Sequence, residues 1–521
     1  MAKTSSKYAI ALTAALGLFM AVLDNTIVNV ALTPMAKGLN ASLSSIQWVV
    51  TGYFLAQAAI IPVAGYFSIR FGMKRVFILC LAFFTLGSLL CGLAQNESML
   101  IGFRILQGLG GGALFPLASA IAFSAFPPNE RATSSAVVGI PVLLAPAFGP
   151  TIGGLLTVNF GWQYIFFINV PVGAVAIFLA WRIFPADNVA PATNRRPFDY
   201  VGLALSILGV LAIVYAFTLV GQSQPGTETV TNPRGDIYGW SYWLVWTLIA
   251  AGLLILAAFT YYELRISKDP VLDLNLFKNY NFTMASIVSG LSAVVVFGSI
   301  FLLPVFLEQV RVPHLSALDA GLALMPQGLA AAVAVAIGGR LYNRIGVRAM
   351  VVIGSVLLII SSWQLTQLKL DTDGVAIMPW LIIRGFGFGL TAIPVQTLAL
   401  ASITGPALAK ASSLFNVTRQ IFSSIGIAVL TTLFVQQSSQ HATEIRATLP
   451  TPPAGTVVDP NSPAFVQLSA QAGTNGMNDV FLIVTIGTLL LLLIAFALPG
   501  RMRKDEAAVT EGEVRHPVMA E

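Results

Sequence analysis

Of the 22 acidic residues in this sequence of 521, only Asp24 lies well inside a long apolar stretch. A charged carboxylate is costly in hydrocarbon, so we expect Asp24 to face a cavity and to have a function there. It could carry a proton, or it could be the counter-ion of a cationic substrate. The alternative is a structural Asp that caps or packs its helix through hydrogen bonds to Asn25, Thr26 or Asn29.

Three arginines, Arg104, Arg384 and Arg419, also fall inside apolar stretches. Because arginine keeps its charge at neutral pH, none of them can itself shuttle protons. The alternative to a functional role is that each only ties helices together through backbone carbonyl groups. A further carboxylate, Glu308, ends an apolar stretch beside Arg311, where it is either a solvated partner of that arginine or part of a site.

The composition excludes an ordinary soluble protein. Hydrophobic residues make up 56% of the chain and charged residues 10%, where soluble proteins have about 25% charged residues. The net charge of +6 does not indicate nucleic-acid binding, because the cations lie in short loops rather than on one basic face. The sequence contains no credible metal cluster, catalytic triad or nucleotide motif. We therefore expect no enzyme activity, no metal, no cofactor and no nucleic-acid partner.

Stretches of about 20 apolar residues are long enough to cross a bilayer as helices. The pattern predicts an all-α membrane protein with fourteen transmembrane helices and both termini on one side. The expected spans cover residues 8–32, 44–67, 76–94, 99–124, 134–157, 163–184, 199–221, 241–263, 281–306, 318–340, 347–367, 376–402, 410–434 and 478–499.

The distribution of Lys and Arg predicts the orientation of these spans. Of the 28 cations, three lie inside spans, and the loops on one side carry only Lys37, Arg234, Arg311, Lys369 and Arg446. The other 20 lie on the side of the termini. Because positive charges are retained in the cytoplasm, we expect a multi-pass protein of the cell (inner) membrane with both termini cytoplasmic.

A short basic segment occurs twice between apolar runs, at nearly the same spacing. The two copies contain Gly65, Arg70, Gly72 and Lys74, and Gly339, Arg344, Gly346 and Arg348. Glycine allows a tight turn and close packing, and the cations stay on the cytoplasmic side. An ordinary positively charged loop is the alternative, but the repeated spacing favours a duplicated unit.

The repeat predicts how the chain is divided. Residues 1–198 form one six-helix half, 199–263 two extra helices, and 264–521 a second six-helix half with an outer loop near 436–477 and a cytoplasmic tail. Two such halves around a midplane site are typical of secondary transporters. We expect the outer loop to be mostly irregular because of its five prolines, Pro450, Pro452, Pro453, Pro460 and Pro463. His314, His441 and His516 all fall outside the expected spans.

Four motifs together resemble the major facilitator superfamily, and within it the fourteen-helix drug:proton antiporters of the EmrB and QacA type. They lie at residues 23–32, 104–108, 139–154 and 416–420, in the first, fourth, fifth and thirteenth expected helices. The resemblance covers nearly the whole chain. One departure is that the hairpin motif of the superfamily usually has an acidic residue where this chain has Ile69, with Asn343 in the second copy.

The resemblance implies proton-coupled efflux of lipophilic, often cationic compounds by alternating access. It also implies that Arg104 tunes a nearby carboxylate or polarises a water. We expect proton coupling or substrate binding at Asp24, Arg104, Gln107 and Glu308; conformational gating at the eight hairpin residues and at Gly139, Pro146, Gly149, Pro150, Gly153 and Gly154; and cavity or packing roles for Arg384, Asn416, Arg419 and Gln420.

Other functions remain open at this point. A transporter of the same fold could export a dedicated metabolite, lipid or siderophore, because fold does not fix substrate. A membrane receptor or integral-membrane enzyme is disfavoured by the lack of a folded extramembrane domain and of paired catalytic groups in the spans. The expected partners are small-molecule substrates, protons and the lipid bilayer. A periplasmic or membrane-fusion partner is compatible with the sequence, which does not identify one.

Overall fold

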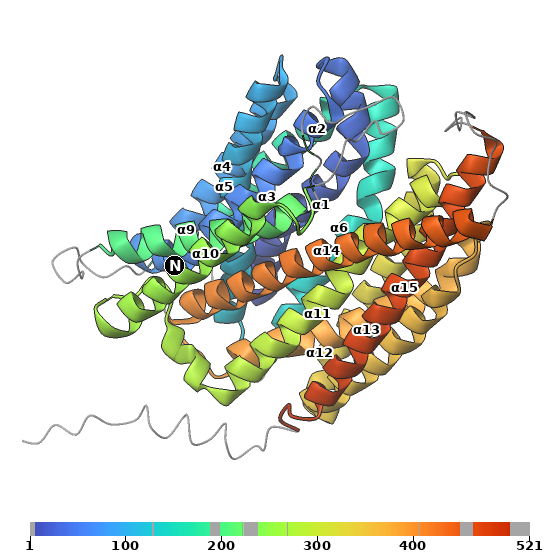
Figure 1. The fold of residues 1–521 in the computed structure, drawn as a ribbon. Helices are drawn as coiled ribbons and strands as arrows, with labels where there is room; N and C mark the ends of the chain where they lie inside the picture. The colour runs from blue at the N-terminus through green and yellow to red at the C-terminus, as the bar shows by residue number, and fades with distance from the viewer. Residues whose placement is uncertain are drawn as a thin grey trace, which may run out of the picture.

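The computed structural model describes residues 6–500 except 128–129, 188–197, 221, 223, 225–237, 268, 406 and 449–461. The regular structure of this part of the chain is helical (Figure 1). The helices are α1 (Lys7–Gly38), α2 (Leu43–Ile46), α3 (Trp48–Phe71), α4 (Met73–Gly92), α5 (Glu97–Ala125), α6 (Arg131–Asn159), α7 (Tyr164–Phe167), α8 (Asn169–Ile183), α9 (Tyr200–Val220), α10 (Trp243–Arg265), η3 (Leu274–Lys278), α11 (Tyr280–Val305), η4 (Phe306–Val310), α12 (Ala317–Gln364), η5 (Leu365–Gln367), α13 (Gly374–Ala401), α14 (Ala407–Thr448) and α15 (Pro463–Ala495).

Fourteen segments of the described chain are helical, long and apolar enough to cross a membrane, which confirms the predicted fold class. Three short helices join their neighbours in this count, since α7 and α8 together form one span, η4 extends α11 and η5 extends α12. Helix α12 supplies two spans, Leu318–Tyr342 and Arg344–Gln367. The chain turns at Gly346, near the start of the second of these spans.

The two predicted hairpins turn at equivalent glycines. Gly72 joins α3 to α4 with φ 98° and ψ 139°, and Gly346 turns the chain within α12 with φ 82° and ψ 165°. A positive φ strains any residue with a side chain, so glycine is required at both positions. The shared backbone geometry supports an internal duplication.

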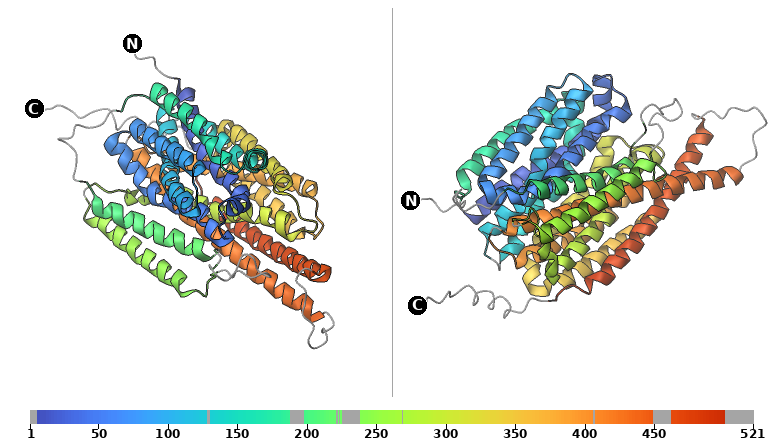
Figure 2. Two further views of the ribbon diagram at one scale, coloured as in Figure 1. Left: turned by 90° about the horizontal axis from the view of Figure 1, so that it is seen from above. Right: turned by 60° about the vertical axis from the view of Figure 1, so that its left-hand side comes forward.

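The helices form two groups with a lateral pair (Figure 2). Helices α1 to α8, drawn in blue to teal, form what we call the N-terminal half, and α11 to α15, drawn in yellow-green to red, form the C-terminal half. Helix α6 of the first half packs against α12 and α13 of the second, while α3 and α5 pack against α14. The pair α9 and α10 lies beside this interface, because α9 contacts both α3 and α14.

The two halves meet near the face on which α1 begins and α15 ends, which we call the terminal face. Arg131, at the start of α6, donates from Nη1 to backbone carbonyl groups at the end of α13. Further hydrogen bonds join Gly65 N to Ser413 Oγ, Ser412 Oγ to the Pro116 carbonyl, Gln396 Nε2 to Ser119 Oγ, and Ser135 Oγ to Thr397 Oγ1. The structure is therefore closed at the terminal face.

The irregular structure expected for residues 436–477 is wrong at both ends of that segment. Helix α14 continues to Thr448, and α15 already begins at Pro463. Proline is tolerated in the first turn of a helix, where its missing N–H would have no partner. The other four prolines lie outside the described residues. One consequence is that His441 lies within α14, where its Nε2 is 2.7 Å from Oδ2 of Asp479.

Candidate functional site

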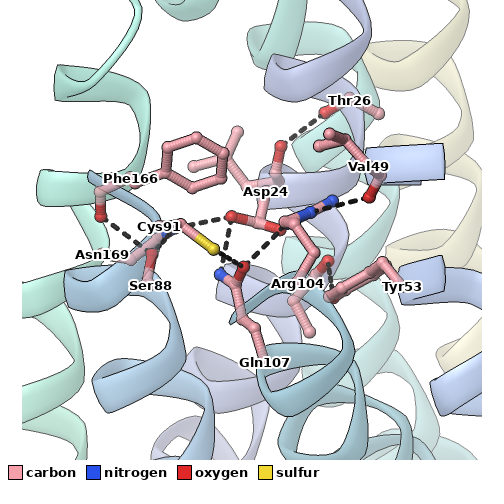
Figure 3. Close-up of polar contacts among 12 residues, drawn as sticks. Asp24, Thr26, Val49, Tyr53, Ser88, Cys91, Arg104, Gln107, Phe166 and Asn169 are labelled. Atoms are coloured by element: carbon pink, nitrogen blue, oxygen red, sulfur yellow. Dashed lines mark hydrogen bonds and ion pairs between the residues drawn. The ribbon is translucent and has the colours of Figure 1, made fainter. Parts of the chain in front are cut away.

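Asp24 and Arg104 form a buried ion pair inside the N-terminal half (Figure 3). Nη1 of Arg104 donates to Oδ2 of Asp24 at 2.5 Å, and neither side chain has any exposed surface. The carboxylate comes from α1 and the guanidinium from α5, so the pair joins two helices. An ion pair removed from water is stable only where further hydrogen bonds complete it, and the neighbouring residues supply them.

Two amide side chains complete the hydrogen bonding of the Asp24 carboxylate. Gln107, one turn after Arg104 on α5, donates from Nε2 to Oδ1 of Asp24 at 2.9 Å, and its Oε1 accepts from Nη1 of Arg104 at 2.8 Å. Asn169, at the start of α8, donates from Nδ2 to the same Oδ1 at 2.8 Å. The same Nδ2 lies 3.1 Å from Oγ of Ser88, so α4 also supports the site.

The guanidinium of Arg104 is held from its other sides by α3 and α7. Its Nε donates to the Val49 carbonyl at 3.1 Å. Its Cζ lies 4.1 Å from the ring centre of Tyr53 and 5.6 Å from that of Phe166, and the face of an aromatic ring stabilises a cation. Arg104 is thus fixed in a position from which its charge acts on Asp24.

These contacts correct one expectation about Asp24. The side chain does not face a cavity, because it is fully enclosed and its charge is compensated by Arg104 instead of by water. The hydrogen bonds above run to other helices rather than to Asn25, Thr26 or Asn29, so a purely local helix cap is not the arrangement found. The resemblance suggested that Arg104 acts on a nearby carboxylate, and the structure brings the two side chains into contact.

The glycines and prolines that we expected to act in gating lie along α6. A Cβ at Gly139 would lie 2.6 Å from Cδ1 of Ile393 in the C-terminal half. Gly149 and Gly153 instead pack on α1 of their own half, where a Cβ on Gly153 would be 3.1 Å from the Ile27 carbonyl oxygen. Gly154 has open space around it. All three prolines of α6 lie in this stretch, the expected Pro146 and Pro150 together with Pro141, and Pro150 packs against Gly321 of α12.

The first hairpin is held by an acidic residue that the sequence analysis did not single out. Asp187, which follows α8, accepts hydrogen bonds from the backbone N–H groups of Lys74 and Arg75 at 2.9 and 3.1 Å. These groups belong to the first turn of α4, where an anion is favoured. A Cβ on Gly72 would collide with the same carboxylate. Arg70 lies over the ring of Phe198, with its Cζ 4.9 Å from the ring centre.

The second hairpin contacts the N-terminal half through its first glycine. A Cβ on Gly339 would lie 2.9 Å from Cβ of Ala136 in α6, much as one on Gly65 would lie 2.6 Å from the Ala409 carbonyl oxygen in α14. Arg344 is exposed, and Arg348 donates from Nε to the Leu498 carbonyl at 2.6 Å. The first glycine of each hairpin motif therefore packs against the opposite half.

The remaining predicted site residues belong to the C-terminal half and do not reach Asp24. Glu308 is half-buried in η4. Arg384 is fully buried on α13 and donates from Nη1 to Ser362 Oγ at 2.9 Å. On α14, Nη2 of Arg419 donates to Oδ1 of Asn416 at 2.9 Å, and Gln420 is half-buried beside it.

Sequence reasoning missed Asn169 and Arg131. Asn169 follows a short helix and has neither charge nor motif to mark it. Arg131 was counted among the cations that only set the orientation of the loops, whereas the structure places it across the interface of the two halves. A cation directly at a helix start, where the helix dipole disfavours it, was the available signal.

Comparisons with known proteins agree with the fold. Residues 14–427 match the family Major Facilitator Superfamily. The chain is 34% identical over 504 residues to the Multidrug resistance protein B homolog of Mycobacterium tuberculosis (strain H37Rv), covering 94% of this chain and 89% of that protein. It is 33% identical over 437 residues to the Fatty acid resistance protein FarB of Neisseria gonorrhoeae, covering 83% and 82%.

Among solved structures, the proton:xylose symporter XylE superposes with a TM-score of 0.59 at 12% identity, over 95% of this chain and 96% of that one, which shows a shared fold. The fourteen apolar helices, the two halves and the family match lead to the same conclusion. The chain is a multi-pass membrane protein that belongs to the Major Facilitator Superfamily.

Proposed function

We propose that this protein exports lipophilic, often cationic, small molecules in exchange for protons, by alternating access between its two halves. The observation that carries the proposal is the buried Asp24–Arg104 pair with its two amide donors. The name of the Mycobacterium tuberculosis relative, Multidrug resistance protein B homolog, supports export of several compounds.

The proposed coupling follows from the chemistry of the pair. Arg104 stays charged, so Asp24 is the member that takes up and releases a proton. Protonation removes the negative charge and turns one carboxyl oxygen into a donor, which leaves a buried guanidinium uncompensated. An unpaired buried charge is strongly unfavourable, so α1 and α5 must rearrange until water or another group reaches Arg104.

Helix α1 also packs against α6, which lies at the interface between the halves. A change at Asp24 can therefore be transmitted to that interface through the glycines of α6 that rest on α1. At Gly149 and Gly153 the two helices pack so closely that an added Cβ would meet Thr26 and Ile27 of α1. This arrangement supplies the mechanical link that an exchanger needs between a proton site and a gate.

We further propose that the termini are cytoplasmic in a cell (inner) membrane, as the excess of Lys and Arg on that side indicates. With this orientation, the structure is closed toward the cytoplasm. Substrate would enter from the terminal face when the halves separate there and would leave on the opposite side. A periplasmic or membrane-fusion partner would then contact the side opposite the terminal face.

The test is substrate-induced proton release in detergent, with a lipophilic cation such as ethidium as the probe. Asp24→Asn should abolish the release and proton-driven export in reconstituted vesicles, while the protein stays folded, because Asn retains the shape and hydrogen-bonding capacity of the side chain. Asp319→Asn, at the exposed start of α12, is the matched control and should behave as the wild type. Equal release from Asp24→Asn and the wild type would remove Asp24 as the carrier and direct attention to Glu308.

Export of lipophilic carboxylic acids is a second candidate, favoured by Arg419. Its guanidinium lies 6.0 Å from the ring centre of Phe115 in the opposite half. Within the described residues, no carboxylate forms an ion pair with it. One relative is named Fatty acid resistance protein FarB. Oleate export by the wild type and by Arg419→Gln, with ethidium as the competing substrate, tests this substrate class. Loss of oleate export in Arg419→Gln would support export of carboxylic acids, and unchanged oleate export would exclude this role of Arg419.

A further inference from the structure

Two carboxylates are buried where the lateral helix pair meets the terminal face. Asp199 immediately precedes α9 and has an exposed fraction of 7%, and Glu263 lies in the last turn of α10 with 5%. Neither belongs to the Asp24 site, which lies in the interior of the N-terminal half. Burial of two acidic side chains at one place is costly unless something compensates both charges.

The two carboxylates face each other across Gly202. A Cβ on this glycine would lie 2.7 Å from Oδ2 of Asp199 and 2.9 Å from Oε1 of Glu263, so the two oxygens are no farther apart than the sum of these distances. The backbone N–H of Gly202 donates to Oδ1 of Asp199, and Ser267 Oγ donates to Oδ2. Oε1 of Glu263 accepts from the backbone N–H of Val271, whereas Oε2 is buried without a described partner.

The cations nearby are already committed to other groups. Nζ of Lys410 forms an ion pair with Asp269 at 3.1 Å and donates to the Pro270 carbonyl. Arg70 lies over the ring of Phe198, and its Nη1 is 3.5 Å from the Tyr66 hydroxyl. The titratable groups that interact with the two carboxylates are thus Tyr66 from α3, Tyr262 from α10 and Lys410 from α14. Asp269, in the loop after α10, is the ion-pair partner of Lys410.

The same residues belong to the closed gate. The backbone N–H of Asp199 donates to the hydroxyl of Tyr66 at 3.2 Å, and Nζ of Lys410 lies 5.5 Å from the centre of the Tyr66 ring. The residue before Tyr66, Gly65, donates to Ser413 across the two halves. Separating α3 from α14 would therefore remove the groups that bury Asp199 and Glu263, and would admit water to them.

We propose that Glu263 carries a proton beside Asp199 while the terminal face is closed, and releases it to water on that side when the face opens. A second negative charge buried beside Asp199 is unfavourable, and a proton on Glu263 both removes that charge and makes the carboxyl group a hydrogen-bond donor, where Oε2 is otherwise buried without a described partner. The lateral helix pair thereby acts as a proton-sensitive latch on the gate. The inference rests on the proposed alternating access but does not depend on Asp24.

The direction of the effect follows from linkage. Because the closed state binds one more proton than the open state, low pH favours closing and the closed state is lost as the pH rises. The ratio of closed to open protein should fall about tenfold per pH unit over the range in which the open state is deprotonated and the closed state is not. Asp24→Asn should keep this dependence while it abolishes export, so failure of the latch and failure of the proposed coupling are distinguishable.

The test measures the distance between spin labels on the two halves as a function of pH, in lipid nanodiscs. Ser124→Cys and Thr404→Cys provide exposed label sites on the terminal face, and the two native cysteines are buried. Glu263→Gln retains an acceptor for Val271 N–H and can donate permanently to Asp199. This variant should stay closed at high pH and lose the pH dependence.

Two glycine variants separate the effect of the carboxylate contact from a general disturbance of α9. Gly202→Ala places a methyl group between the two carboxylates and should weaken the pH dependence, while Gly209→Ala meets only side chains of α10 and is the matched control. An unchanged pH dependence in Glu263→Gln would overturn the proposal. So would a response to Na⁺ at constant pH, because it would make the pair a metal-cation site.

Discussion

Arg131 offers the sharpest test of how the terminal face is closed. Its Nη1 donates to the carbonyl groups of Leu400, Ala401 and Ile403 at 2.8, 2.6 and 2.9 Å, so one buried cation from the N-terminal half binds the end of α13 in the other half. The carbonyl end of a helix carries partial negative charge, which favours a cation there. Arg131→Gln removes the charge and shortens the side chain, so it breaks this contact without adding bulk.

The loss can be worked out from these contacts. Hydrogen bonds from a charged donor contribute about 1.5–3 kcal/mol net, and the helix terminus adds roughly 0.3–1 kcal/mol. Because the side chain is buried, solvent screens little of this, and we expect the closed state to lose about 2–4 kcal/mol relative to the open state. At about 1.4 kcal/mol for each factor of ten, the ratio of closed to open protein should fall roughly 30- to 700-fold.

The assay is the distance between labels at Ser124→Cys and Thr404→Cys, under conditions in which the parent protein populates both states. Arg131→Gln should shift the distribution strongly toward the long distance. The matched control is Arg75→Gln, because the side chain of Arg75 is 79% exposed and its Nε lies as far as 4.0 Å from Oδ2 of Asp187. An exposed ion pair of this kind contributes little, so this variant should leave the distribution unchanged. The same populations in Arg131→Gln and the parent would refute the role of Arg131 as a clamp.

Three further predictions concern packing and support of the site. Gly139→Leu should slow export of every substrate alike, because even a Cβ there would meet the opposite half, whereas Gly154→Leu has open space and should export normally. Gly72→Val should impair transport but not membrane insertion, since a positive φ strains a branched residue by about 1–3 kcal/mol. An unfolding temperature equal to that of the wild type would contradict this strain. Asn169→Ala should lower the transport rate, through loss of a hydrogen bond worth about 0.5–1.5 kcal/mol to Asp24, while the number of protons released per substrate stays the same.

The sequence predicted the helices well because the bilayer imposes their length and composition. Asp24 and Arg104 were recognisable because an ionisable side chain in an apolar span needs a reason to be there. Their contact was not, since it depends on how α1 and α5 pack. Asn169 is an ordinary amide until the fold brings it to Asp24, and Arg131 is one of many basic residues near a loop. Pro463 did not distinguish a loop from a helix start, because proline is as suited to the first turn of a helix as to a loop.

Each half of the protein buries an arginine, Arg104 in the N-terminal half and Arg384 in the C-terminal half, and the membrane voltage acts on the difference in how their charges are compensated. Arg104 is neutralised by Asp24, whereas within the described residues Arg384 forms no ion pair. A proton on Asp24 would add one uncompensated charge to the N-terminal half at a depth where the transmembrane field is felt. That field acts with about 2.3 kcal/mol per charge per 100 mV across the full membrane. The voltage would then act on the protonated pair, which carries a net positive charge, and not on the neutral unprotonated pair, so export of an uncharged substrate should be electrogenic.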